Sequence, residues 1–237
     1  MSVALNTDRY ELTMVQAALA SGKAHQPCVF EVFARKLPAG RRFGVVAGTA
    51  RVVEAIANFK FTEEQLVFLE TNNVVNKETL SYLSDFKFTG NVSGYREGEL
   101  YFGNSPILTV EASFAEAVLL ETVILSILNY DSAVASAAAR MRSAASERFL
   151  AEMGSRRAHE SAAVSAARAA YLVGFDATSN LEAGMRYGIP TMGTSAHSFT
   201  LLYETEDAAF EAQLSALGNG TTLLVDTFDV RRAVQKA

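Results

Sequence analysis

His197 lies in a loop of small and hydroxyl-bearing residues, 193–199 (GTSAHSF), that directly follows the apolar run 189–192. Only three histidines occur in the chain, and this one comes just after a predicted buried strand. Imidazole transfers protons or accepts a phosphoryl group near neutral pH, and small residues let a phosphate approach the backbone. The loop alone equally allows a histidine with satisfied hydrogen bonds at an ordinary strand end.

Three further polar clusters follow apolar or helical stretches. Residues 154–158 follow an Ala-rich helical pattern, residues 174–180 follow the apolar run 170–173, and residues 226–229 follow the apolar run 223–225. Such alternation predicts βα units around a parallel sheet or barrel, where ligands bind at the carboxyl ends of strands. Each cluster alone is also compatible with a turn or a helix cap. Four clusters in one alternation favour a ligand site.

Five segments together carry a family resemblance, and they occur in the family's order: 7–14, 154–158, 174–180, 193–199 and 226–230. In these segments the chain resembles nicotinate phosphoribosyltransferase, and the resemblance runs from about residue 5 to the C-terminus. It implies an α/β fold of the type II phosphoribosyltransferase kind. It also implies transfer of phosphoribose from phosphoribosyl pyrophosphate to nicotinate, giving nicotinate mononucleotide and pyrophosphate, with Mg²⁺ as cofactor and ATP as co-substrate.

The resemblance implies a role for each matching residue. Tyr10 would stack on the nicotinate ring of a neighbouring subunit, and Arg156 with Arg157 would contact substrate carboxylate or phosphate. Arginine suits this task because its planar fork binds such groups through two hydrogen bonds. The alternatives are a core aromatic for Tyr10 and a surface ion pair for the arginines.

The phosphate-binding loop implied by the resemblance contains Thr194, His197 and Ser198, with His197 as the residue that ATP phosphorylates. Asp226 and Thr227 would touch ribose hydroxyls or Mg²⁺-bound water. Their alternative role is to cap the following helix.

Ser179 occupies the position that the resemblance links to substrate choice. Related nicotinamide-using enzymes have an aspartate there, which can accept a hydrogen bond from a carboxamide but repels a carboxylate. A serine hydroxyl donates to nicotinate instead, although Ser179 could also simply cap a helix. Ser179 and the His197 loop therefore disfavour the alternative of a nicotinamide or quinolinate phosphoribosyltransferase.

Composition predicts a soluble, cytoplasmic protein. The 237 residues are 49% hydrophobic and 20% charged, with a net charge of −5, and so lack the basic surface typical of nucleic-acid binding. The single Cys28 cannot form an internal disulfide, which suits a reducing compartment. The apolar stretch 117–128 is too short to span a membrane.

Periodicity divides the chain near residue 130. Upstream, residues 1–130 form an N-terminal α+β domain; downstream, residues 131–237 form the first half of an irregular βα barrel with catalytic strand ends. The predicted elements are helices from Thr7 or Asp8 to Ala20, at 48–59, 62–70, 115–128 and 133–153, a strand at 28–33, and a hairpin at 90–102 around Glu97 and Gly98 with its partner strand at 106–112.

A complete eight-unit βα barrel needs about 250 residues, far more than the stretch 131–237 provides. We therefore expect this chain to correspond to the N-terminal half of the enzyme. Exposed barrel edges then favour a homodimer with a shared active site, with Tyr10 close to a partner's Arg156. The competing hypothesis is a truncated fragment without catalytic activity.

Overall fold

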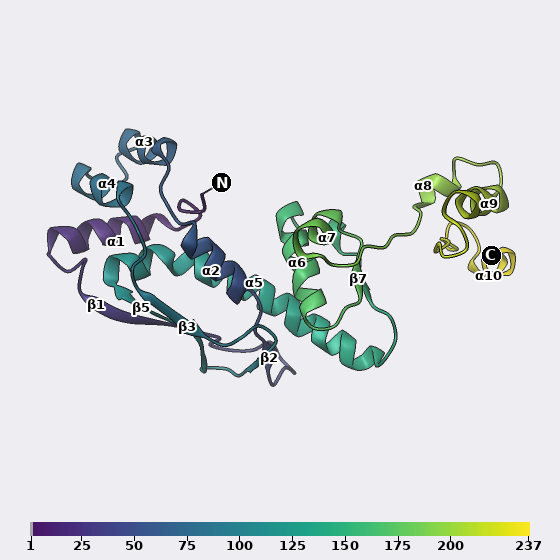
Figure 1. Cartoon of the computed structure of the whole chain (residues 1–237), viewed down its shortest axis with the longest axis horizontal. Helices are drawn as coiled ribbons and strands as arrows, with labels where there is room; N and C mark the ends of the chain where they lie inside the picture. Colours follow the sequence, from purple (N-terminus) through teal and green to yellow (C-terminus); the bar gives the residue numbers. More distant parts are fainter. Residues whose placement is uncertain (1) are drawn as a thin grey trace.

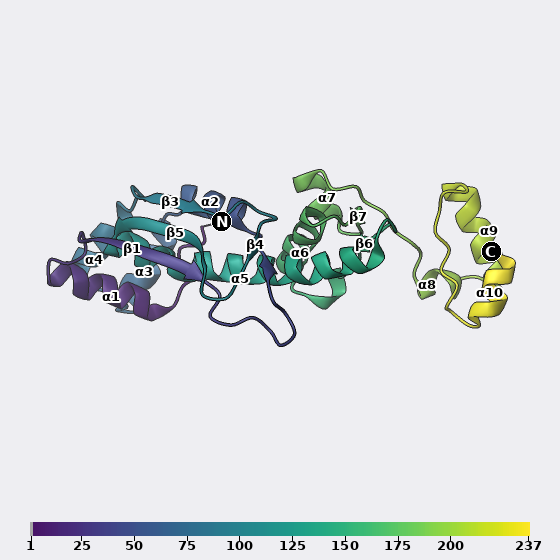
Figure 2. The same cartoon turned by 90° about the horizontal axis from the view of Figure 1, so that it is seen from below.

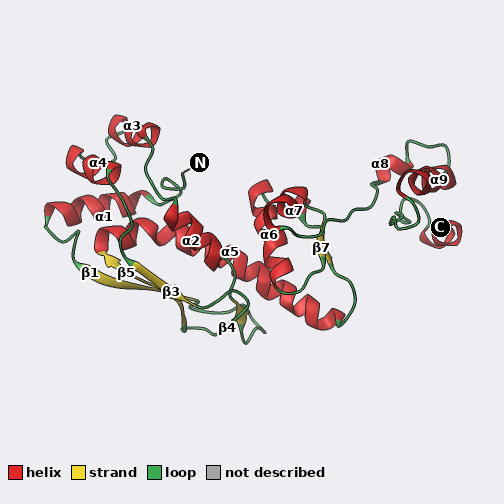
Figure 3. Ribbon diagram, in the orientation of Figure 1, coloured by secondary structure: helices red, strands yellow, loops and turns green. Residues whose placement is uncertain are grey.

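The computed structural model describes residues 2–237, which form an elongated molecule with three successive parts (Figure 1). The N-terminal part contains a sheet covered by helices, the middle part contains a small parallel sheet, and the C-terminal part contains only helices (Figure 3). The elements are, in order, α1 (Arg9–Ala20), β1 (Pro27–Phe33), β2 (Gly44–Val45), α2 (Thr49–Ala57), α3 (Glu63–Thr71), α4 (Lys77–Ser84), β3 (Asn91–Gly94), β4 (Leu100–Tyr101), β5 (Pro106–Ser113), α5 (Phe114–Ala145), β6 (Ala151–Glu152), a 3₁₀ helix (Ser155–Arg157), α6 (Glu160–Leu172), β7 (Ala177–Thr178), α7 (Leu181–Tyr187), α8 (His197–Thr200), α9 (Glu206–Leu217) and α10 (Val230–Lys236).

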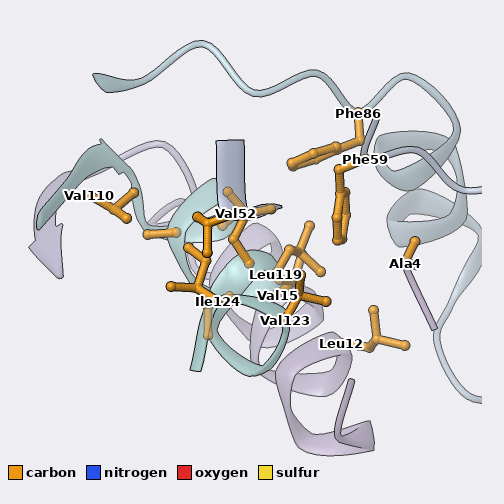
Figure 4. Close-up of a cluster of buried hydrophobic side chains, with 14 of the residues drawn as sticks. Ala4, Leu12, Val15, Val52, Phe59, Phe86, Val110, Leu119, Val123 and Ile124 are labelled. Atoms are coloured by element: carbon orange, nitrogen blue, oxygen red, sulfur yellow. The ribbon is translucent and has the colours of Figure 1, made fainter. Parts of the chain in front are cut away.

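The main sheet is antiparallel, with strand order β1-β5-β3. Alternating residues of β1 are partly buried against the helices, as the alternating sequence 28–33 predicts. Helices α1 and α5 pack in the same core as this sheet, where Leu12, Val15, Leu119 and Val123 are buried together (Figure 4). The predicted strand at 28–33 and the helix ending at Ala20 are confirmed.

The predicted hairpin at 90–102 is wrong. Strand β3 pairs with β5, as expected for its partner, but β4 pairs with β2 instead of folding back on β3. The backbone of 98–99 exchanges hydrogen bonds with Val46, which is fully buried. Burial of the apolar residues 45–47 therefore outweighs the local turn at Glu97 and Gly98.

Helix α5 is one continuous helix of 32 residues, whereas the sequence predicts two helices separated near residue 130. Two polar residues at the expected boundary are held by other elements, since Asp131 binds Arg51 at 2.7 Å and Ser132 binds the backbone of Ala47 at 3.1 Å. The helix ends at Ala145 rather than at 153. The boundary near residue 130 thus falls inside α5, and the division into 1–130 and 131–237 stays a prediction.

Three residues of α5, spaced one turn apart, hold strand β2. Ser132 accepts from the amide of Ala47 and Ser136 accepts from the amide of Val45, at 3.1 and 2.8 Å. Arg140 donates to the carbonyl of Phe43 at 2.8 Å. Because i, i+4 and i+8 lie on one helix face, α5 offers a continuous row of polar groups to the edge of this short strand.

The middle part carries the parallel pairing that the sequence predicts, but with different strands. β6 pairs in parallel with β7, and Thr191 forms an isolated parallel bridge to Thr178. The apolar run 170–173 is not a strand, because Ala163, Ala167 and Ala170 continue the helical spacing of α6 and are buried. Residues 223–225 also form no strand, and α8–α10 lie apart from the parallel sheet (Figure 2).

By length and composition alone, α5 could cross a membrane, and half of its most apolar window is buried inside the protein. The predicted apolar stretch 117–128 is thus part of a longer helix. Its buried residues, including Leu119, Leu120 and Ile124, form the centre of the core, which is the position of a core helix in a globular protein.

Candidate functional site

Three chain segments end at the same edge of the small parallel sheet. The amide of Ser179 donates to the carbonyl of Glu152 at 2.9 Å, which joins the ends of β6 and β7. The amide of Thr178 donates to Pro190, and its carbonyl accepts from Met192, both at 3.0 Å. The loops that follow these strand ends contain three of the four predicted polar clusters. The carboxyl edge of the sheet is therefore the candidate functional site.

Arg156 and Arg157 belong to the 3₁₀ helix that follows β6, and both are exposed. Neither takes part in any of the ion pairs formed within residues 2–237. A surface ion pair, the alternative for these arginines, therefore has no support in the structure. Two guanidinium groups beside a strand end suit an anionic ligand.

Ser179 is half-buried at the end of β7. It does not cap α7, because Asn180 is the capping residue and its side chain accepts from the amide of Ala183 at 2.9 Å. The alternative of a helix cap for Ser179 is thus wrong. An asparagine one residue before a helix is the sequence signal that identifies the true cap.

His197 begins the short helix α8, and its side chain is exposed. Its Nδ1 lies 3.2 Å from the hydroxyl of Thr227, and its Nε2 lies 4.0 Å from a carboxylate oxygen of Asp226. Asp229, rather than Asp226 or Thr227, caps α10 through the amide of Arg232. The structure therefore brings the fourth predicted cluster to the predicted histidine, and the capping alternative is wrong.

Thr194 and Ser198 flank the histidine in the same loop and are both exposed. The hydroxyl of Thr194 donates to the carbonyl of Ser195 at 3.0 Å. Residues 193–196 run away from β7 as an extended segment, so the group around His197 lies apart from the arginine loop in this chain (Figures 1 and 2). The predicted site residues thus form two groups, one at the sheet edge and one at α8.

Tyr10 lies on the first turn of α1, in the N-terminal part and distant from both groups (Figure 1). Its side chain is 49% exposed, so the alternative of a core aromatic is wrong. The negative charge of Glu121 raises the pKa of Tyr10, with smaller contributions from burial and from Glu11. The protonated, neutral phenol form of Tyr10 is therefore favoured.

Glu11, next to Tyr10, is a buried carboxyl group that no sequence pattern distinguishes from the other acidic residues. Its Oε1 accepts from the hydroxyl of Thr122 on α5 at 2.5 Å, and Oε2 accepts from Thr7. Burial raises the pKa of Glu11 to about 6, although the hydrogen bond from Thr122 opposes this change. The carboxyl group fixes the first turn of α1, and with it Tyr10, against α5.

One ion pair connects α6, the helix that follows the arginine loop, with the N-terminal part, and a second ion pair close to it joins α2 to α5. Arg168 of α6 forms two hydrogen bonds with Glu97, at 2.9 and 2.7 Å, and Glu97 also accepts from the amide of Gly48. The second pair is Arg51 with the fully buried Asp131. The partners lie 71 and 80 positions apart, so no local pattern in the sequence reveals them.

Burial and charge act in opposite directions on the carboxyl groups of these pairs. For Glu97, burial acts to raise the pKa, but the bonds from Arg168 and Gly48 more than offset it, so the pKa lies below its ordinary value. For Asp131, burial prevails over Arg51 and the pKa lies above its ordinary value. Glu97 is therefore the firmly ionised partner in this network.

Residues 2–237 contain no group of three or more His, Cys, Asp or Glu side chains able to hold a metal ion. A resident metal centre built by protein ligands alone does not fit these residues. Mg²⁺ is commonly bound by one or two carboxylates together with substrate phosphates, and Asp226 beside His197 is a candidate for such a single contact.

Comparison with known proteins gives a consistent result. Residues 5–129 match the family model described as nicotinate phosphoribosyltransferase (NAPRTase) N-terminal domain. The chain is 57% identical over 241 aligned residues to nicotinate phosphoribosyltransferase pncB1 of Mycobacterium tuberculosis, covering 98% of this chain and 53% of that protein. It is 39% identical over 233 residues to nicotinate phosphoribosyltransferase of Bacillus subtilis, covering 98% of this chain and 47% of that protein.

Solved structures agree on the fold. Human nicotinic acid phosphoribosyltransferase superposes with a TM-score of 0.87 at 28% identity, over 94% of this chain and 55% of that one. The nicotinate-nucleotide pyrophosphorylase of Pyrococcus furiosus superposes with a TM-score of 0.78 at 23% identity, over 96% and 51%. The chain spans about half the length of the relatives it matches. Because the family model covers more than half of the chain, this protein belongs to the nicotinate phosphoribosyltransferase family.

Proposed function

We propose that this chain supplies the pyridine-binding strand ends and the histidine loop of an ATP-coupled nicotinate phosphoribosyltransferase in NAD salvage. The observation that carries the proposal is the meeting of the Arg156 loop and Ser179 at one edge of the parallel sheet, in a chain of this family. An arginine pair and a hydroxyl donor at that edge match the carboxylate of nicotinate.

The proposed reaction needs positioning more than proton transfer. The lone pair of the pyridine nitrogen attacks the anomeric carbon of phosphoribosyl pyrophosphate, a carbon–nitrogen bond forms, and the carbon–oxygen bond to pyrophosphate breaks. No proton leaves the pyridine nitrogen, so a general base is not required. Arg156 and Arg157 would hold anionic groups of the substrates, and Ser179 would donate to the nicotinate carboxylate.

His197 is the proposed acceptor of a phosphoryl group from ATP. Its contact with the hydroxyl of Thr227 orients the ring, and its exposure leaves it accessible to a nucleotide. Thr194 and Ser198 would donate to phosphate oxygens. Mg²⁺ would enter with the phosphates of the substrates, with Asp226 as its single proposed protein contact.

We further propose a homodimer in which the exposed Tyr10 of one subunit covers the site of its partner, because Tyr10 is distant from the strand ends of its own chain. We propose that the reaction takes place in the cytoplasm, which agrees with the burial of the long apolar helix α5 in the core and with the free thiol of Cys28.

Two assays test this function. The chain is incubated with nicotinate, phosphoribosyl pyrophosphate and Mg·ATP, and nicotinate mononucleotide is measured. In parallel, the chain replaces the matching half of the Bacillus subtilis relative, and this chimera is assayed beside the intact relative. Product from the chain or the chimera supports the proposal. Product from the chimera alone supports the competing hypothesis that the isolated chain is inactive. An inactive chimera that folds contradicts the proposal.

A further inference from the structure

Thr178 is fully buried and contacts all three strand ends of the candidate site. Its backbone bonds to Pro190 and Met192 on one side, at 3.0 Å each. On the other side its hydroxyl donates to a carboxylate oxygen of Glu152 at 2.9 Å. A single threonine therefore joins the strand that precedes the arginine loop to the segment that precedes the histidine loop.

The hydroxyl of Thr178 also accepts from the amide of Asn180 at 3.0 Å, and the side-chain amide of Asn180 donates to the hydroxyl of Ser155 at 3.1 Å. The second carboxylate oxygen of Glu152 accepts from the amide of Gly154. Since Gly154 and Ser155 are adjacent, these bonds close a ring. We call it the strand-end ring; its members are Glu152, Gly154, Ser155, Thr178 and Asn180.

Gly154 leaves room for the carboxylate of Glu152, which any larger residue at this position would displace. A Cβ atom at this position would lie 2.6 Å from the carboxylate oxygen of Glu152, closer than real Cβ contacts allow. The ring also gives both carboxylate oxygens of Glu152 a hydrogen-bond donor within the protein. The carboxylate of Glu152 is therefore satisfied by hydrogen bonds within the ring, and it leaves Arg156 and Arg157 free for an anionic ligand.

We propose that Thr178 is a positioning residue whose hydroxyl, acting through the strand-end ring, fixes the distance between the Arg156 loop and Ser179 so that both reach one pyridine carboxylate. This inference rests on the proposed function for the identity of the ligand. The existence of the strand-end ring does not depend on that function, because its members bind one another and Thr178 is fully buried.

Two variants of Thr178 separate the hydroxyl from the packing. Thr178→Val keeps the branched shape and removes the hydroxyl, whereas Thr178→Ser keeps the hydroxyl and removes the methyl group. Ser155→Ala opens the ring at its half-buried side and serves if the valine variant does not fold. The chain itself is used, with nicotinate and nicotinamide as probes.

The first measurement needs no ligand. Hydrogen exchange of the amides of Asn180 and Gly154, followed by NMR, is expected to be faster in Thr178→Val than in the wild type, and unchanged in Thr178→Ser. The second measurement is calorimetric binding. Nicotinate binding is expected to weaken by about tenfold in Thr178→Val, the order expected for a lost contact with a charged group, with a smaller change for nicotinamide. Thr178→Ser is expected to bind nicotinate as tightly as the wild type. With Ser155→Ala the same weakening of nicotinate binding is expected, without faster exchange at Asn180.

Equal exchange and equal nicotinate binding in wild type and Thr178→Val would overturn the inference. A serine variant as weak as the valine variant would also overturn it, because packing rather than the hydroxyl would then matter. If neither the wild-type chain nor the chimera described above binds nicotinate, the proposed function fails, and the proposed role of Thr178 in carboxylate binding fails with it. The exchange measurement still decides in that case whether the hydroxyl holds the two loops together.

Discussion

The Nδ1 atom of His197 lies 3.2 Å from the hydroxyl of Thr227, thirty positions further along the chain. This contact leaves Nε2 directed toward Asp226 at 4.0 Å. A histidine whose one nitrogen is held by a hydroxyl is oriented for chemistry at the other.

We expect His197 to become phosphorylated by ATP in the active form of the protein. Incubation with labelled ATP should give a label that is lost in acid and retained in base, and His197→Ala should abolish it. His159→Ala is the matched control, because His159 is also exposed and lies at the start of a helix. Equal labelling of wild type and His197→Ala would remove His197 from this role.

Ser179 is expected to set the preference for nicotinate over nicotinamide. In Ser179→Asp the new carboxylate repels nicotinate and accepts from the carboxamide, which should shift the ratio of kcat/KM values toward nicotinamide by about 1–3 kcal/mol. Ser161→Asp, on the exposed side of α6, adds the same charge outside the site. A ratio that is unchanged in Ser179→Asp would contradict the assignment.

Glu11 should make the protein less stable as pH rises. Its pKa is about 6 in the folded chain against an ordinary 4.5, so ionisation costs more in the folded state than in the unfolded state. The destabilising effect of Glu11 is absent when the pH is below the ordinary pKa and develops as the pH rises from there to about 6. At higher pH it reaches about 2 kcal/mol. Urea unfolding of wild type and Glu11→Gln at acid and neutral pH should therefore show that the wild type loses stability relative to the variant.

The exposed Glu64 provides the control for this experiment, since Glu64→Gln changes the same chemical group at the surface. A stability difference between wild type and Glu11→Gln that does not vary with pH would show that Glu11 is ionised in the folded chain as readily as in the unfolded one.

Arg168→Met should destabilise the protein by about 3 kcal/mol, because it leaves the largely buried carboxylate of Glu97 without its cation. Arg186 also lies near the ring of Tyr187 but forms no ion pair within residues 2–237, so Arg186→Met is the control and should change stability by less than about 0.5 kcal/mol. Chemical denaturation measures both. Similar losses in the two variants would mean that contact with Tyr187, not the ion pair, provides the stability.

A shared active site makes a prediction about mixtures. Tyr10→Ala and Arg156→Ala should each be inactive alone, in whichever form of the protein is active. After mixing and exchange of subunits, about a quarter of the wild-type activity should return, because half of the dimers then contain one intact site of two. No recovery in a mixture shown to contain heterodimers would place Tyr10 and Arg156 in the same subunit's site or outside it.

Local patterns in the sequence predicted the elements that depend on neighbouring residues. The alternation of apolar and polar residues predicts strand β1, and Ser21 with Gly22 marks the end of helix α1. The failures depend on distant contacts: the pairing of β4 with β2, and the continuity of α5 through Asp131, are decided by residues more than 40 positions away.

The candidate site divides in the same way. Arg156, Ser179 and His197 were predicted because each lies in a short segment that resembles the family. Thr178 and Glu152 were not, because their importance lies in hydrogen bonds between two loops 26 positions apart. A buried threonine at a strand end looks like any other β-branched residue until the partner strand is known.

One helix belongs to both the N-terminal and the middle part, and this restricts how the molecule can bend. At 32 residues, α5 is a rod about 48 Å long that packs against α1 at one end and α6 at the other. A hinge between these two parts would have to break α5 or the Glu97–Arg168 bond beside it. Residues 193–196 belong to no helix or strand, so we expect any movement that brings the His197 loop to the sheet edge to occur about this segment.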